Sequence, residues 1–67
     1  MFNKNKLSAK IIENGFSVQE IAEKLGINPS TLYRKMNSET DFTRNEITML
    51  RDFLHFSLEE MNEIFFA

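Results

Sequence analysis

The chain has 67 residues, of which ten are acidic and eight basic, so the net charge is −2 at pH 7. This length fits one domain, spanning residues 1–67, at the small end of what folds alone, and a content of 42% apolar and 27% charged residues excludes a disordered chain. There is no cysteine and only one histidine, which excludes disulfides, thiolate–zinc sites and multi-histidine metal sites.

Signals for the starts of helices divide the chain clearly. Ser17, Thr43 and Ser57 are each followed three residues later by a glutamate, which is the pattern of a capping box. Asn28 followed by Pro29 is a fourth start, where the asparagine is expected to cap and the proline to occupy the first helical position. Together with the apolar spacing, these signals predict an all-α fold without a sheet, with a compact set of five helices at about 4–14, 18–25, 29–36, 44–55 and 58–65.

The stops are also marked. Gly15 is expected to end the first helix, and Gly26 to supply the positive φ that a tight turn between the second and third helices needs. Asn37 is expected to end the third helix in the left-handed conformation, and His55 to be a cation at the end of the fourth. Residues 17–37 therefore form two short helices joined by a turn, which is the layout of a DNA-reading helix-turn-helix.

The third of these helices differs from the others in its charge. No acidic residue lies between Asn28 and Asn37, whereas every other predicted helix contains at least one. Its inner face is formed by Leu32 and Met36, which leaves polar and basic side chains outward. Exclusion of carboxylates from one helix is what proximity to DNA phosphates favours.

The charge is distributed unevenly along the chain. Residues 1–36 contain six basic and three acidic side chains, for a net charge of +3. Residues 37–67 contain two basic and seven acidic side chains, for a net charge of −5. We therefore expect DNA to contact the first half, although a mixed solvated surface alone also accounts for the charges.

The stretch from Val18 to Asn37 resembles the helix-turn-helix of the Cro and repressor family of phages, the lambda-repressor-like superfamily. Ala22 stands where that family has a small residue, and Gly26 matches its turn glycine. Further matches fall at the apolar core positions Ile21, Leu25, Ile27 and Leu32. The five-helix layout extends the resemblance over most of the chain, and the nearest in character are the short Cro-like proteins of phages and prophages.

The resemblance implies a role for each residue at the matching positions. The positions that face the major groove are Asn28, Pro29, Ser30, Tyr33 and Arg34. Arg34 is the leading candidate for a base contact, because a guanidinium bonds O6 and N7 of guanine together. The candidates for phosphate contacts are Gln19, with the amides at the start of its helix, Thr31, Lys35 and Arg44.

The two predicted C-terminal helices carry more apolar surface than one small core needs. Ile47, Leu50 and Leu54 share one face, and Met49, Phe53 and Phe56 lie nearly opposite. The residues expected to form a dimer or partner surface are Met49, Phe53, Phe56, Ile64 and Phe66, with inward packing as the alternative. A homodimer on a palindromic operator is predicted, because one weakly charged copy binds DNA poorly.

These observations favour a sequence-specific transcriptional regulator of double-stranded DNA, a Cro-like repressor encoded by a phage or prophage and acting in the bacterial cytoplasm. The alternative is an antirepressor that captures a repressor protein through the acidic, phenylalanine-rich half. An antitoxin-type regulator combines both activities, and a helix-turn-helix also occurs as a packing unit without DNA. We expect no enzyme, cofactor, metal site or membrane contact, because the sequence has no nucleophile arrangement, no glycine-rich loop and no apolar span.

Overall fold

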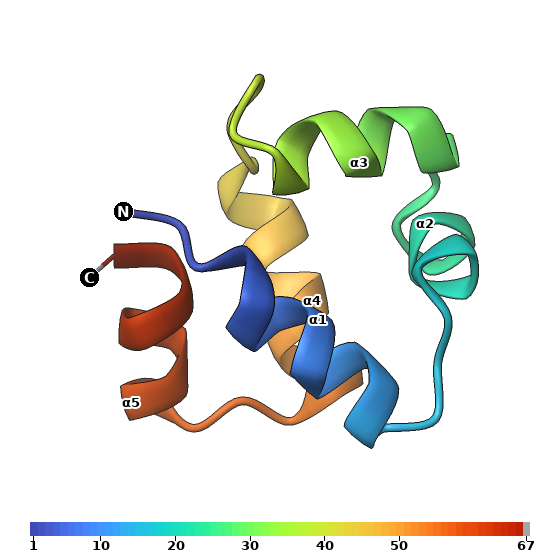
Figure 1. The fold of residues 1–67 in the computed structure, drawn as a ribbon. Coiled ribbons are helices and arrows are strands. Elements are labelled where there is room, and N and C mark those ends of the chain that lie inside the picture. Colours follow the sequence, from blue (N-terminus) through green and yellow to red (C-terminus); the bar gives the residue numbers. More distant parts are fainter. Residues whose placement is uncertain (67) are drawn as a thin grey trace.

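The computed structural model describes residues 1–66, and this part of the chain is built from helices and connecting turns (Figure 1). The helices are α1 (Lys4–Glu13), α2 (Val18–Leu25), α3 (Pro29–Met36), α4 (Arg44–Leu54) and α5 (Leu58–Met61), and α5 continues into a π-helical turn, η1 (Asn62–Phe66). In Figure 1, α1 lies in front of α4 at the centre, α2 and α5 lie on opposite sides, and α3 runs along one edge of the molecule. The all-α prediction is confirmed for the described residues.

The predicted helix bounds agree with the structure to within one residue for the first four helices. α4 ends at Leu54, because His55 takes the left-handed conformation with φ 56° and closes the helix as its cap. The fifth helix differs more, since its regular part stops at Met61 and the rest is π-helical. A helical period cannot be told from a π-helical one over five residues, so the sequence contained no signal for this change.

Three predicted caps are present and two others differ from prediction. All three capping boxes form in both directions, with Glu20, Glu46 and Glu60 accepting from the backbone N–H of Ser17, Thr43 and Ser57 at 2.8–2.9 Å. Asn28 occupies the N-cap position of α3, but its side chain makes no capping hydrogen bond, and the proline that follows leaves one amide fewer to satisfy. The left-handed residue after α3 is Ser38 (φ 63°), whereas Asn37 stays at φ −89°.

One apolar core is shared by α1 to α4 and η1, and Met61 of α5 packs against it. Its buried side chains come from α1 to α4, from the α4–α5 connection and from η1: Leu7, Ile11, Ile21, Ala22, Leu25, Leu32, Met36, Leu50, Leu54, Phe56 and Ile64. The residues from 39 onwards are therefore part of the same folding unit as the helix-turn-helix. Burial of this set is the main stabilising term for so small a domain, because the chain has no cysteine for a disulfide and residues 1–66 contain no cluster of side chains that could hold a metal ion.

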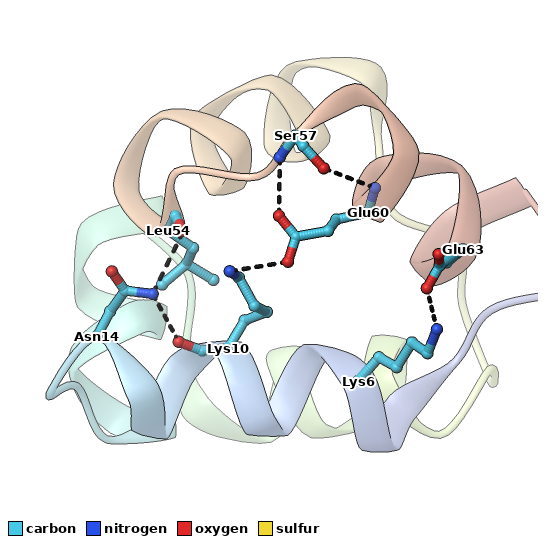
Figure 2. A network of polar contacts seen from close by, with 7 residues as sticks. All are labelled: Lys6, Lys10, Asn14, Leu54, Ser57, Glu60 and Glu63. Carbon is cyan, nitrogen blue, oxygen red and sulfur yellow. Dashed lines mark hydrogen bonds and ion pairs between the residues drawn. The ribbon is translucent and has the colours of Figure 1, made fainter.

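A polar network holds the C-terminal segment against α1 (Figure 2). Lys10 Nζ lies 2.9 Å from Glu60 Oε2, and Lys6 Nζ pairs with Glu63 Oε2. The backbone N–H of Asn3 also donates to the carbonyl of Ile64 at 2.7 Å. The hydrogen bond to Glu60 raises the pKa of Lys10, and the Ser57 amide together with Lys10 lowers the pKa of Glu60.

The phenylalanines of the second half pack mainly against other parts of the same chain. Phe65 has its ring centroid 5.7 Å from that of Phe2, 5.6 Å from Phe42 and 6.1 Å from Phe56. These distances are typical of aromatic pairs in protein cores. The cluster joins the N-terminal segment, the α3–α4 loop and the C-terminal turn, and so accounts for much of the apparent surplus of apolar residues.

The predicted partner surface is consequently wrong for two of its five residues. Phe56 and Ile64 are only 7% and 1% exposed, because they belong to the core. Phe53 is partly buried, and the ammonium of Lys24 lies 5.2 Å from its ring centroid. Met49 is partly buried as well, which leaves Phe66, 63% exposed, as the most open member of the set.

Candidate nucleic-acid interface

The turn between α2 and α3 is built from local backbone chemistry. Gly26 takes φ 73°, ψ 29°, and its N–H donates to the carbonyl of Glu23 at 3.0 Å. The N–H of Ile27 donates to the carbonyl of Ala22, also at 3.0 Å, which completes a left-handed helix stop. A β-carbon at Gly26 would meet no atom within 4 Å, so the glycine is needed for its dihedral angle rather than for space.

Helix α3 presents a polar face away from the core. Leu32 and Met36 are 0% and 2% exposed and define the inner side. At about 100° per residue, Ser30 and Arg34 lie opposite that side and one turn apart, and both are exposed. In Figure 1, α3 forms the upper edge of the molecule, and no other helix of residues 1–66 lies above it.

The other predicted base-reading residues flank this face. Asn28 is exposed at the N-cap, Pro29 is half-buried at the first helical position, and the Tyr33 side chain is 50% exposed. The structure thus brings all five predicted base-reading residues onto one short helix and its cap. An eight-residue helix with exposed hydroxyls and a guanidinium along one side has the chemistry that base edges in the major groove require.

The start of α2 is less open to phosphate than the sequence suggested. The Glu20 carboxylate accepts from the N–H of Ser17, and the N–H of Glu20 donates to the Ser17 hydroxyl at 3.1 Å. The capping box therefore uses two of the amides at this end and places a negative charge beside them. Gln19 itself is exposed, and its side chain remains a candidate donor.

Ion pairs connect the basic first half of the chain with its acidic second half, a pairing that the charge distribution along the sequence did not predict. Three of the six basic side chains in residues 1–36 pair with carboxylates from the second half: Lys6 with Glu63, Lys10 with Glu60 and Lys35 with Glu46. Arg34 and Arg44 are exposed and have no ion pair with a carboxylate of residues 1–66. These pairs neutralise two of the three lysines of α1 and one of the two cations of α3, where Arg34 keeps its charge.

The three remaining predicted phosphate contacts differ in how accessible they are. Lys35 is turned inward, with its ammonium 3.0 Å from Glu46 Oε1 and 2.9 Å from the carbonyl oxygen of Asp41, so in this conformation it is not available to a phosphate. The signal for this was its position three residues after the buried Leu32, on the flank of the inner face. Thr31 is partly buried, whereas Arg44 is exposed at the first position of α4.

With this geometry in view, the comparison with known families identifies the chain. Residues 2–38 match the family described as bacterial regulatory protein, Fis family. The chain belongs to this helix-turn-helix family. The matched segment contains α1, α2 and α3, including the turn at Gly26 and the whole of the outward-facing helix.

The family match supports the coarser part of the sequence prediction. A DNA-binding helix-turn-helix regulator is supported, whereas the match does not extend to the Cro and repressor type in particular. No curated protein and no solved structure matches the chain. Within residues 1–66, no helix is both long enough and apolar enough to span a bilayer.

Proposed function

We propose that this protein is a sequence-specific transcriptional regulator that reads the major groove of double-stranded DNA with residues 28–36. The observation that supports this most is the exposed, acid-free outer face of α3 in a chain of the helix-turn-helix family. In the proposed complex, Arg34 bonds a guanine edge, and Ser30, Tyr33 and the α3 N-terminus at Asn28 and Pro29 contact neighbouring bases. Gln19, Thr31 and Arg44 contact phosphates, which set the position of the helix without specifying sequence.

We propose further that two copies act together on a palindromic site. An α3 of eight residues is about 12 Å long, which spans only about four base pairs. Few cations are left for phosphates after the three internal ion pairs, so one copy has little non-specific affinity. Two copies at half-sites about 34 Å apart contact twice as many base pairs and twice as many phosphates, which raises both the specificity and the affinity.

The finer form of the proposal is a Cro-like repressor of a phage or prophage, which blocks a promoter by occupying it. The five-helix layout, with α4 and the C-terminal segment closing the core behind the helix-turn-helix, supports this form. The antirepressor alternative loses most of its basis, because the phenylalanines pack against one another and several acidic side chains pair within the chain.

Selection from a pool of random duplexes tests the proposal. The full chain should enrich a common motif and bind it more tightly than a scrambled duplex at two salt concentrations. Arg34→Ala should lose about 1–3 kcal/mol at the selected site and relax the preference at one base pair. Arg51→Ala is the matched control, since that exposed arginine lies beside Asp52 in the last turn of α4, and it should leave the preference unchanged. Equal affinity of the wild-type protein for selected and scrambled duplexes would refute sequence-specific binding.

Two copies on one duplex are tested by sedimentation of the protein–DNA complex. A single copy per selected site at saturating protein would exclude the dimer, and a motif without two-fold symmetry would exclude the palindrome.

A further inference from the structure

The last turn of α3 is tied to α4 and to the loop between them by one lysine. Lys35 Nζ lies 3.0 Å from Glu46 Oε1 and donates to the Asp41 carbonyl at 2.9 Å. It also lies 6.0 Å from the centroid of the Phe42 ring. The Lys35 and Glu46 side chains are only 11% and 12% exposed, so solvent screens this pair less than the pairs on α1.

Glu46 is held in place before it meets the lysine. Its Oε1 accepts from the N–H of Thr43 at 2.8 Å, and its own N–H donates to the Thr43 hydroxyl at 3.1 Å. Burial favours the neutral acid, but the Thr43 amide and the Lys35 ammonium outweigh it and lower the pKa of Glu46. Because α4 also buries Leu50 and Leu54 in the core, the carboxylate is a fixed acceptor on a fixed helix.

Helix α3 needs such a contact. It has eight residues and buries only two of them, Leu32 and Met36, which constrain its rotation and tilt weakly. Its N-terminal end is set by the turn at Gly26, whereas its C-terminal end is held by the buried Met36 and by polar contacts. Besides the contacts of Lys35, a side-chain hydrogen bond at that end runs from Lys4 Nζ to Asn37 Oδ1, at 2.7 Å on an exposed surface.

We propose that Lys35 and Glu46 are positioning residues, which fix the orientation of α3 so that Arg34 and Ser30 meet base edges, and that Lys35 does not contact DNA. This inference rests on the proposed function. Hydrogen bonds to bases weaken steeply outside a narrow range of distance and angle, so a small rotation of α3 costs specific contacts while leaving general attraction to phosphates intact.

The substitution Glu46→Gln distinguishes a positioning role from a simple effect of charge, because the two predict opposite changes in affinity for the selected duplex. Glutamine keeps the acceptor for the Thr43 amide, so the cap of α4 is retained. Removal of a negative charge strengthens attraction to DNA if charge alone matters, and it also releases Lys35 towards phosphates. Positioning instead predicts weaker binding of the selected duplex, by roughly three- to tenfold, with affinity for a scrambled duplex unchanged or increased.

Lys35→Met is the second test variant, because it keeps the aliphatic part of the side chain and removes the ammonium group. We expect a similar loss at the selected duplex and an unchanged slope of log affinity against log salt. Arg44→Met, at a proposed phosphate contact, is the control and should reduce that slope by about 0.9 for one phosphate. The double variant Lys35→Met/Glu46→Gln should lose no more than either single variant, since both remove the same contact.

The outcomes separate this inference from the proposed function. All variants are compared at a temperature where circular dichroism shows them folded, and the ratio of selected to scrambled affinity is the readout, because a smaller folded fraction lowers both affinities equally. Tighter or unchanged specific binding by Glu46→Gln, or a slope reduced by about one in Lys35→Met, would overturn the positioning role. A wild-type protein that does not discriminate between duplexes would instead overturn the proposed function itself.

Discussion

Replacement of Ile64 by alanine tests whether the C-terminal segment is part of the domain core. Ile64 lies in η1, the last element of the part of the chain that the structure describes. Its side chain is 1% exposed, and its carbonyl accepts from the Asn3 N–H at 2.7 Å. Ile64 therefore belongs to the core that α1 to α4 form.

The magnitude follows from burial. Truncation of a fully buried isoleucine to alanine costs about 2–5 kcal/mol. A 67-residue domain has about 3–10 kcal/mol of stability in total. Ile64→Ala should therefore remove a large share of it and lower Tm by about 8–40 °C, because each kcal/mol corresponds to about 4–8 °C in a domain of this size.

The assay is urea and thermal unfolding followed by far-UV circular dichroism at several protein concentrations. Phe66→Ala is a matched control in the same turn, since Phe66 is 63% exposed and should change stability by no more than about 0.5 kcal/mol. An Ile64→Ala protein as stable as the wild type would refute the core role. A loss of stability that grows with protein concentration would assign Ile64 to an interface between copies instead.

Three further outcomes are expected. Gly26→Ala should lower the free energy of unfolding in urea by about 1–2 kcal/mol, because residue 26 has a φ of 73° that alanine adopts at a cost. Gly26→Asn should lower it by less, and equal losses in the two variants would indicate a packing cause. Because the pKa values of Glu46 and Glu60 are lowered in the folded state, their contribution is present above the usual glutamate pKa of about 4.3 and is lost as the pH falls below it. Tm measured across this range should therefore fall with acid, and less steeply in Glu46→Gln. Lys6→Gln should leave the salt slope of DNA binding nearly unchanged in a fluorescence titration, because Lys6 pairs with Glu63.

The sequence predicted the elements whose signals are local. Ser17 with Glu20, and Thr43 with Glu46, fixed helix starts because a capping box involves only residues three apart. Gly26 fixed the turn for the same reason, since its positive φ is a property of one residue. The outward face of α3 followed from the helical period around Leu32 and Met36.

Features that depend on contacts between distant residues were not predictable in the same way. The pairing of Lys10 with Glu60 joins residues 50 positions apart, and no local pattern marks it. The partner surface was wrong at Phe56 and Ile64, because composition shows an excess of apolar residues but not which of them the aromatic cluster covers. The inward turn of Lys35 depends on where α4 places Glu46, which again requires the tertiary structure.

The segment that matches the family ends at residue 38, but the part of the chain beyond it has two consequences for the interface. Leu50, Leu54 and Ile64 complete the core beneath α1 to α3, so the helix-turn-helix has its supporting surface only with α4 and η1 present. Glu60 and Glu63 neutralise lysines of α1, while α3 itself contains no acid and keeps Arg34 unpaired with any carboxylate of residues 1–66. An acidic second half and a DNA-reading first half are therefore compatible, because three of the acids pair with Lys6, Lys10 and Lys35, and none of the four ion pairs found in residues 1–66 involves Arg34.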